Sequence, residues 1–311
     1  MTILVSGSVA FDHIMTFPQK FADHILPDKL DDLNVAFNIT DWQTHFGGTG
    51  GNIGFCLRLL GEDPLILATV GTDFGPYGDW FDRHAMSREG LRVFDDVRSP
   101  QGFVTTDIVG NQIWNFYEGA MSRAHEARVE DLESALDFAI VSANGKQAML
   151  DHARVLKSRN IPTFIDPSHG LPLLDRDETL ALIDGCAAYI VNDYEWSLTL
   201  EKTSLSERQI IERCSAVVIT KGKDGSSIHE GGRVIEIPPV GASRVVDPTG
   251  CGDAYRAGLI HGRANGLPFE TAGRMASLLG AWQVEFEGTQ NLDLNIEAFR
   301  ERYEREFGSA F

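Results

Sequence analysis

The chain has 311 residues, of which 43% are hydrophobic, and a formal net charge of -18 at pH 7. This length and composition suffice for one large domain with a full core. The acidic charge excludes an extended nucleic-acid surface, since phosphate backbones bind to basic footprints, so we expect a small-molecule partner and no nucleic acid.

Short apolar runs alternate with helix-length amphipathic stretches along most of the chain. This alternation is typical of a parallel sheet covered by helices. Ligands of such sheets bind at the carboxyl ends of the strands, where Ser8, Asp166, Asn192 and Thr220 fall. The first helix-like stretch is 52–60, and the runs are 3–5, 64–70, 138–141, 163–166, 189–191 and 217–220.

Two regions, about 12–45 and 92–117, break this alternation with period-two patterns. Val35, Phe37 and Ile39 alternate in the first region, and Gln112–Tyr117 alternates in the second. These patterns predict antiparallel strands that pair into a small second sheet. Such a sheet above the strand ends would form a lid that excludes water. We therefore expect one α/β domain over 1–311 with a lid made of two insertions. The edge of the lid leaves monomer and homodimer both open.

The segment Asp247–Asp253 is rich in small residues and leads into an apolar-patterned run from Ala254 to Leu259. A glycine-flanked turn before a helix leaves backbone N–H groups free, and together with the helix dipole they suit an anion. Asp253 would repel a bound phosphate, but it could accept the proton of a hydroxyl that attacks the phosphate. The segment therefore fits either phosphoryl transfer to an alcohol or a glycine-rich turn whose aspartate caps a helix.

Three motifs decide between these interpretations. Asp247–Asp253, Gly47–Asn52 and Asn192–Glu195 resemble, in order, the Asp-x-Thr-Gly-x-Gly-Asp, Gly-Gly-x-x-x-Asn and Asn-x-x-Glu motifs of the ribokinase-like (PfkB) family of carbohydrate and nucleoside kinases. Together they extend over most of the chain. The resemblance implies an ATP-dependent kinase with a three-layer α/β/α fold, a central mostly parallel sheet and a small β-sheet lid.

The resemblance also implies roles for residues at two of these motifs. Asp253 would be the general base, and the amides of Gly250, Cys251 and Gly252 would form the anion hole. The acceptor sugar would be held at the start of the chain and at the second motif. The residues expected to bind substrate are Ser8, Asp12, Gly48, Thr49 and Asn52. Without the resemblance, Asp12 reads as a turn residue and Asn52 as an ordinary residue near a helix start.

ATP and Mg²⁺ are expected at the later motifs. By resemblance, Asn192 and Glu195 would hold Mg²⁺, largely through water, and one carboxylate is chemically sufficient because magnesium keeps several waters. The glycine-rich turn Thr220-Lys221-Gly222, with Gly225, would line the ATP groove. K⁺ often assists this family near the Asp247–Thr249 loop, and we treat it as a possible cofactor.

Two residues depart from the usual pattern of the family. Cys251 stands where alanine is usual, and a thiol at a helix start is expected to have a lowered pKa and to be sensitive to oxidation. Arg256 stands where a small apolar residue is more usual, and it could contact a phosphate or pair with a surface acid. We favour the surface pair slightly.

The acceptor alcohol is the least determined feature. The segments 7–12, 119–121 and 248–254 look most like bacterial nucleoside kinases of the adenosine-kinase type. Phe37, Trp114 and Phe116 could stack on a purine. We therefore expect phosphorylation of the 5′-hydroxyl of a purine nucleoside, with adenosine slightly preferred. An inosine/guanosine kinase, a sugar kinase of the ribokinase or fructokinase type, and a nucleoside-binding regulator without catalysis are the alternatives.

The remaining features favour a cytoplasmic protein. Residues Met1–Val5 lead directly into a strand-like segment, so no targeting segment is expected, and no apolar run could span a bilayer. The four cysteines, Cys56, Cys186, Cys214 and Cys251, lack the spacing of metal ligands. We interpret them as reduced thiols.

Overall fold

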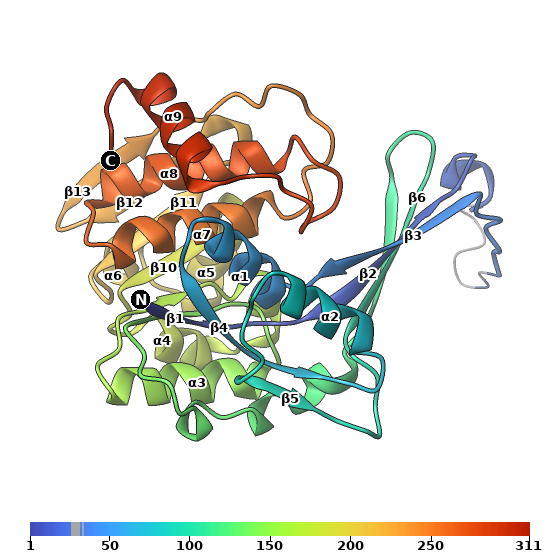
Figure 1. Cartoon of the computed structure of the whole chain (residues 1–311), viewed down its shortest axis with the longest axis horizontal. Helices are drawn as coiled ribbons and strands as arrows, with labels where there is room; N and C mark the ends of the chain where they lie inside the picture. Colours follow the sequence, from blue (N-terminus) through green and yellow to red (C-terminus); the bar gives the residue numbers. More distant parts are fainter. Residues whose placement is uncertain (26–31, 33) are drawn as a thin grey trace.

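The computed structural model describes residues 1–25, 32 and 34–311. Its largest element is a nine-stranded sheet in the order β13-β12-β11-β10-β9-β8-β1-β4-β5 (Figure 1). β12 pairs antiparallel with both of its neighbours, β13 and β11, and all other neighbouring strands of the sheet pair parallel. The strands are β1 (Thr2–Ser6), β4 (Asp63–Val70), β5 (Leu91–Val93), β8 (Phe138–Val141), β9 (Thr163–Ile165), β10 (Ala188–Asn192), β11 (Ala216–Thr220), β12 (Ser226–Glu230) and β13 (Arg233–Ile237).

Helices cover both faces of this sheet. Ile3 and Val5 of β1 lie in one hydrophobic core and Leu4 lies in another, because successive side chains of a strand point to opposite faces. The strands are buried on both faces, which explains their continuous apolar runs. One face carries α1 (Thr49–Leu59), α2 (Gly75–Arg83), α7 (Cys251–Ala264), α8 (Phe269–Gln283) and α9 (Ile296–Phe307); the other carries α3 (Lys146–Ser158), α4 (Arg176–Ile183), α5 (Asp193–Thr203) and α6 (Glu207–Ile211).

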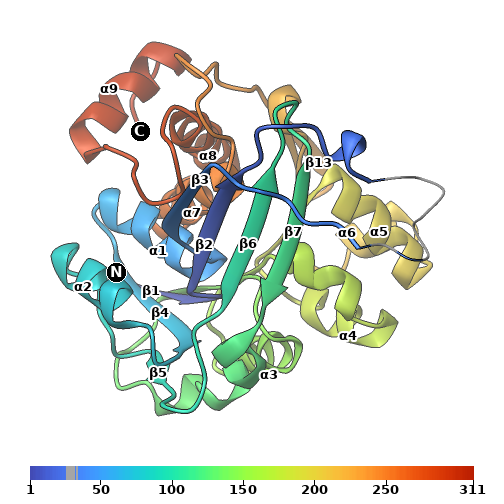
Figure 2. The same cartoon turned by 90° about the vertical axis from the view of Figure 1, so that its right-hand side faces the viewer.

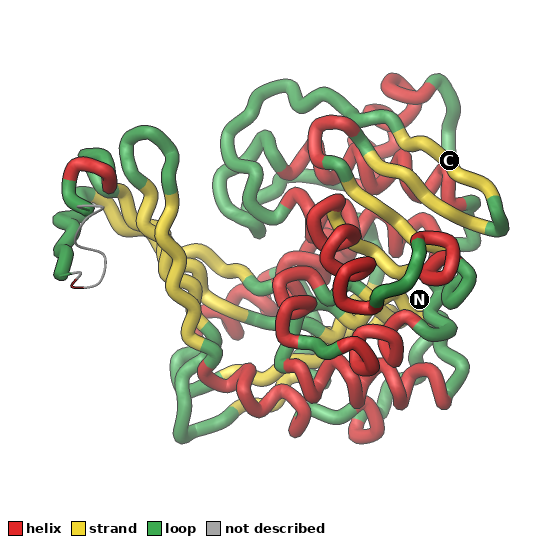
Figure 3. The backbone as a smooth tube through the Cα atoms, turned by 180° about the vertical axis from the view of Figure 1, so that it is seen from behind, coloured by secondary structure: helices red, strands yellow, loops and turns green. Residues whose placement is uncertain are grey.

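A second sheet projects from the body of the molecule (Figures 1 and 3). Its order is β3-β2-β6-β7, with β2 (Ala10–Thr16) parallel to β6 (Gln101–Thr106) in the middle. β3 (Asp41–Gly47) and β7 (Gln112–Tyr117) pair antiparallel at the two edges. Strands from two distant parts of the chain thus lie side by side (Figure 2). The expected three-layer fold with a small lid sheet is confirmed. The predicted antiparallel pairing of the two insertions is wrong where they meet, since β2 and β6 are parallel.

The two expected insertions contribute to the lid only in part. Residues 91–93 pair with β4 in the large sheet, so the second lid segment begins later than 92. The predicted strand around Val35, Phe37 and Ile39 is wrong, since this stretch has no regular structure. Phe37 packs instead on Phe17 and Phe21, with ring centroids 5.0 and 4.8 Å away. Residues 26–31 and 33 of the first insertion lie outside the described residues.

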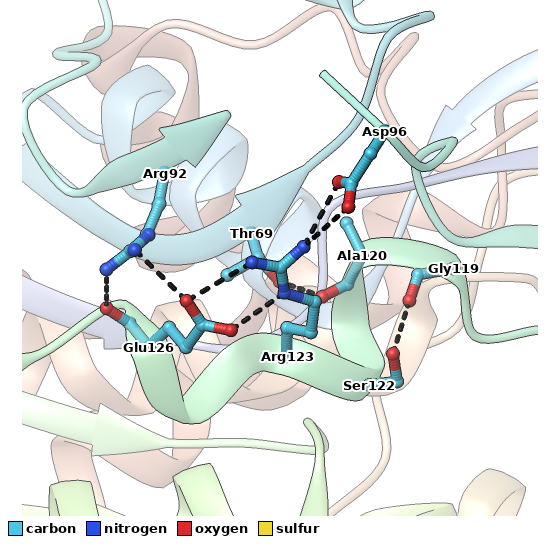
Figure 4. A network of polar contacts seen from close by, with 8 residues as sticks. All are labelled: Thr69, Arg92, Asp96, Gly119, Ala120, Ser122, Arg123 and Glu126. Atoms are coloured by element: carbon cyan, nitrogen blue, oxygen red, sulfur yellow. Dashed lines mark hydrogen bonds and ion pairs between the residues drawn. The ribbon is translucent and has the colours of Figure 1, made fainter. Parts of the chain in front are cut away.

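A polar network fixes the point where the chain leaves the lid (Figure 4). After β7, a 3-10 helix (Gly119–Glu126) returns to the large sheet, and the Thr69 hydroxyl of β4 donates to the Ala120 carbonyl at 2.7 Å. Arg123 forms ion pairs with Asp96 and Glu126, and Glu126 also pairs with Arg92. These bonds join the base of the lid to the edge of the large sheet.

Within the part of the chain that the structure describes, every helix is too short or too polar to cross a membrane.

Candidate active site

The start of helix α7 presents free backbone donors to the carboxyl edge of the large sheet. Gly250 caps the helix with a φ of 77°, and an added Cβ would lie 2.9 Å from the Thr289 side chain, so only glycine fits there. Among residues 1–25, 32 and 34–311, no backbone carbonyl accepts from the N–H groups of Gly250, Gly252 and Asp253. These donors and the helix dipole make the segment suitable for an anion.

Cys251 differs from both expectations about it. Its N–H donates to the Pro248 carbonyl at 3.2 Å, so this amide belongs to a turn and is not a free donor of the anion hole. Burial, together with the negative charge of Asp253, raises the pKa of its thiol. The predicted lowered pKa is therefore wrong, because desolvation outweighs the helix start.

The carboxylate of Asp253 is held by a chain of buried amides. Asn52 Nδ2 donates to Asp253 Oδ2 at 2.8 Å, and Gln290 Nε2 donates to Asn52 Oδ1 at 3.0 Å. Because Gln290 occupies the oxygen of the Asn52 amide, the nitrogen must face Asp253. Gln290 also donates to the hydroxyl of Tyr77, which itself donates to the Gly47 carbonyl. Asn52 thus contacts the proposed base, although the sequence predicted a contact with substrate.

The environment of Asp253 suits a general base near neutral pH. Burial raises its pKa to about 7, while the Asn52 hydrogen bond and the charge of Arg256 act in the opposite direction. The charges of Asp166 and Asp12 raise the pKa further. A carboxylate with such a pKa can accept and release a proton at physiological pH.

Asp12 lies at the base of the lid in a notch formed by two glycines. An added Cβ on Gly47 of β3 would lie 2.0 Å from Asp12 Oδ2, and one on Gly102 of β6 would lie 2.8 Å from Oδ1. The lack of side chains at these neighbours therefore makes room for the carboxylate. Burial raises the pKa of Asp12 to about 6. It points to the same region as Asp253, since each charge acts on the pKa of Tyr77.

Ser8, Gly48 and Thr49 hold the start of helix α1. The Thr49 N–H donates to Ser8 Oγ at 3.1 Å, and Thr49 Oγ1 donates to the Ala143 carbonyl at 3.0 Å. Gly48 has a φ of 84°, and an added Cβ would lie 2.5 Å from the Ser8 carbonyl oxygen. Both hydroxyls are buried and bonded to protein. Their contact with substrate stays a prediction.

Asn192 and Glu195 form a reciprocal cap at the start of helix α5. Asn192 Oδ1 accepts from the Glu195 N–H at 2.7 Å, and Glu195 Oε2 accepts from the Asn192 N–H at 2.9 Å. The pair therefore also has a structural role that its spacing alone could have indicated. Burial raises the pKa of Glu195.

The donor set at Asn192 and Glu195 fits Mg²⁺ bound through water. One carboxylate oxygen of Glu195 is not used by the cap. No group of three or more His, Cys, Asp or Glu side chains that could hold a metal occurs among the described residues. The protein would thus supply few direct ligands, and waters and substrate phosphates would complete the shell, as is usual for Mg²⁺.

The expected ATP-binding turn connects β11 to β12 beside this cap. Thr220 lies opposite Asn192 in the register of the two parallel strands. The Lys221 N–H donates to the Gly225 carbonyl at 2.8 Å, which closes the turn. Gly222 and Gly225 have φ values of 56° and 85°, and an added Cβ on Gly225 would lie 2.2 Å from the Ile237 carbonyl oxygen. The predicted residues are thus neighbours at one sheet edge.

Hydrogen bonds of the protein hold the Asp247–Thr249 loop, where K⁺ is expected as a possible cofactor. Each carboxylate oxygen of Asp247 already accepts a backbone N–H, one from Thr249 and one from Gly288. Gln283 Nε2 donates to the Gly288 carbonyl at 2.7 Å and approaches the Thr249 carbonyl at 3.5 Å. An oxygen that accepts one hydrogen bond keeps a second lone pair, so K⁺ at this loop stays a prediction. We derive no step through K⁺.

A cavity of about 220 Å³ lies between the lid and the loops 246–249 and 287–289. Asp12 forms part of its wall, and Trp114, Ile14 and Val104 line its lid side. Phe116, also on the lid, faces His169 beyond β9 with ring centroids 6.4 Å apart. Phe37 is not among the residues of the wall; it packs on the aromatic rings of Phe17 and Phe21.

Arg256 forms a buried ion pair that the sequence did not predict. Its Nη2 lies 2.9 Å from Asp166 Oδ1, at the carboxyl end of β9, and neither side chain is at the surface. The expected pairing with a surface acid is therefore wrong. No local signal could have found this pair or Gln290, because their partners are far away in the sequence.

Comparison with known proteins agrees with this geometry. The model of the pfkB family carbohydrate kinases matches residues 7–296. The chain belongs to this family. Like other members, it is a phosphotransferase with an alcohol group as acceptor.

Several relatives within the family are nucleoside kinases, and a ribokinase of Bacillus subtilis is also similar. The nucleoside kinase of Methanothermobacter thermautotrophicus is 30% identical over 297 residues, which are 93% of this chain and 91% of that protein. The structure of Burkholderia thailandensis nucleoside kinase in complex with inosine has a TM-score of 0.91 and 37% identity, covering 99% of this chain and 100% of that one. The Methanocaldococcus jannaschii nucleoside kinase has a TM-score of 0.88 at 25% identity, covering 98% of both chains. These similarities support ATP-dependent nucleoside kinase activity.

Proposed function

We propose that this pfkB family member transfers the γ-phosphate of ATP to the 5′-hydroxyl of a purine nucleoside, with Asp253 as general base. The observation that carries the proposal is the position of the Asp253 carboxylate beside the free N–H groups at the start of α7. A base and an anion-binding site in one turn suit a reaction in which a hydroxyl loses its proton while it attacks a phosphate.

The reaction follows from the arrangement of these groups. The 5′-oxygen attacks the γ-phosphorus, its proton passes to Asp253, and the bond between the γ-phosphorus and the β–γ bridging oxygen breaks to release ADP. The N–H groups of Gly250, Gly252 and Asp253 stabilise the charge of the transferring group. Mg²⁺ near Asn192 and Glu195, when bound, neutralises phosphate charge. Asn52 and Gln290 hold the Asp253 carboxylate in place to accept the proton of the attacking hydroxyl.

Recognition of the nucleoside is assigned to the base of the lid. Asp12 would accept hydrogen bonds from ribose hydroxyls, and the adjoining cavity would take the nucleobase against Trp114. Inosine bound to the Burkholderia enzyme supports a purine as this base. Adenosine, favoured by the sequence, stays a prediction beside inosine.

The test is ATP-dependent ADP release across adenosine, inosine, guanosine, cytidine, ribose and fructose, with the wild type and Asp253→Asn. We expect turnover on a purine nucleoside and a loss in kcat of about 10²–10⁴-fold in the variant, the usual contribution of general base catalysis. Turnover on a free sugar alone would contradict the nucleoside assignment. Full turnover in Asp253→Asn would exclude this residue as the base.

A further inference from the structure

Arg256 is a buried cation in the acidic part of the active site. Its side chain is 8% exposed and that of Asp166 is 1% exposed. Nη2 donates to Asp166 Oδ1 at 2.9 Å, and Asp166 Oδ2 accepts from the Ser142 hydroxyl at 2.8 Å. The guanidinium is therefore fixed to the carboxyl ends of β8 and β9.

The same guanidinium reaches back to the anion-binding turn. Arg256 Nη1 donates to the Gly252 carbonyl at 3.2 Å. That carbonyl belongs to the peptide between Gly252 and Asp253, whose N–H is one of the free donors. One side chain thus connects the peptide that carries the base to two strands of the large sheet. Its Nε is buried and has no acceptor among the described residues.

Acidic groups surround this cation. The charge of Arg256 acts on Asp253 and Glu195, and the charge of Asp166 acts on the same two carboxylates in the opposite sense. The titratable and charged groups that face Asp253 are Cys56 from α1, Tyr77 from α2, Asp12 from β2, Asp166 after β9, and Cys251 and Arg256 from α7. An incoming phosphate adds further negative charge to this region.

We propose that Arg256 is a positioning residue for phosphoryl transfer, which holds the Gly252–Asp253 peptide and balances the acids around the base. This inference rests on the proposed function. The planar guanidinium suits both tasks, because it can bond to a carboxylate and a carbonyl at fixed angles, which an ammonium group cannot.

Stability alone gives a weak reason for such a pair. Removing two charges from water costs several kcal/mol per ion, so replacing a buried ion pair by apolar residues is often neutral or stabilising. A pair placed next to the base instead affects the reaction directly. Arg256 acts to lower the pKa of Asp253, which burial raises, so loss of the cation moves protonation of the base to higher pH.

The test compares kcat and the pH dependence of kcat/KM, with inosine and MgATP, in the wild type and three variants. In Arg256→Met we expect kcat to fall by about 10²-fold, the usual cost of losing an electrostatic group at a reaction centre, and the acid limb to move to higher pH. Arg256→Lys keeps the charge, so its limb should stay near the wild-type position while kcat falls. The double variant Arg256→Met/Asp166→Asn removes both charges. The acid limb of its kcat/KM profile should return toward the wild-type pH.

Wild-type kcat and an unmoved acid limb in a folded Arg256→Met protein would overturn the proposal. If circular dichroism shows that Arg256→Met does not fold, the double variant provides the test, because it leaves no unpaired buried charge. Wild-type kcat in the double variant would likewise refute the role of Arg256. Asp253→Asn distinguishes a failure of the proposed base from a failure of the role of Arg256. Turnover in that variant refutes the proposed base, whereas an inactive Asp253→Asn beside a fully active Arg256→Met refutes only the role of Arg256.

Discussion

The two sheets of the molecule differ in how they expose their side chains. β1, β8 and β10 of the large sheet bury apolar residues on both faces. In the lid sheet, by contrast, Trp42, Trp114 and Phe116 are 63%, 54% and 49% exposed. Buried strands hold functional groups rigidly, whereas an exposed apolar surface is suited to being covered by a ligand. We infer that the large sheet provides the chemistry and the lid provides recognition.

This division predicts that a change at the start of α7 affects turnover and leaves binding intact. Gly250→Ala forces a side chain into a backbone with a φ of 77° and against Thr289. Distortion of the donors should lower kcat by about 10²-fold and leave KM for the nucleoside nearly unchanged. Steady-state kinetics with inosine checks this. A raised KM with a normal kcat in Gly250→Ala would contradict the assignment of chemistry to the large sheet and recognition to the lid.

Asp12, on a lid strand, should instead govern affinity through its protonation. Its pKa is raised to about 6 by burial, so the carboxylate form that accepts ribose hydroxyls is present above that pH and is lost below it. Nucleoside KM should therefore rise by about tenfold per pH unit below 6. The separate loss of kcat through Asp253 should begin near its pKa of about 7. In Asp12→Asn, the pH dependence of KM should disappear; if it persists, another group is responsible.

Trp114 tests whether the lid contacts the nucleobase. It lines the cavity next to Asp12, so Trp114→Ala should remove stacking worth about 1 kcal/mol, or about a fivefold increase in KM for inosine. Trp42, which is exposed on the other edge strand, is the matched control, and Trp42→Ala should leave KM unchanged. Equal effects of the two substitutions would mean that the lid does not recognise the base through this cavity.

The smallest effect is expected where the two parts are joined. Arg123 pairs with Asp96 and Glu126 and lies 3.6 Å from the centroid of the Phe94 ring, but it remains partly exposed (Figure 4). Exposed pairs contribute little, so Arg123→Ala should lower the free energy of unfolding only slightly, with kcat unchanged. Urea denaturation measures this change. A large loss of activity would show that this joint takes part in the reaction.

The sequence allowed the large sheet to be predicted because its signals are local. Buried strands form short apolar runs in the sequence, and the turn before α7 has a glycine, Gly250, where the backbone φ is positive. The prediction of a strand around Val35–Ile39 was wrong. A period-two pattern cannot distinguish a paired strand from an irregular segment whose side chain, here Phe37, packs on other aromatic rings.

The motif residues of the candidate site could be predicted from the sequence, but the contacts between residues far apart in the chain could not. Asp253 and Asn52 belong to motifs, but the Gln290 amide that orients Asn52 comes from a loop near the other end of the chain. Likewise, only the fold brings Asp166 of one strand end to Arg256 of α7. Such contacts depend on tertiary packing, which a single sequence does not display.

The most direct test of the account is to identify the product. Purified protein with MgATP and either inosine or adenosine should be followed by phosphorus NMR with proton coupling. We predict a phosphomonoester coupled to the two 5′-methylene protons, formed in equal amount with ADP. Inorganic phosphate without a monoester from both nucleosides, or a phosphorylated product only when ribose replaces them, would contradict the assignment of this protein as a nucleoside 5′-kinase.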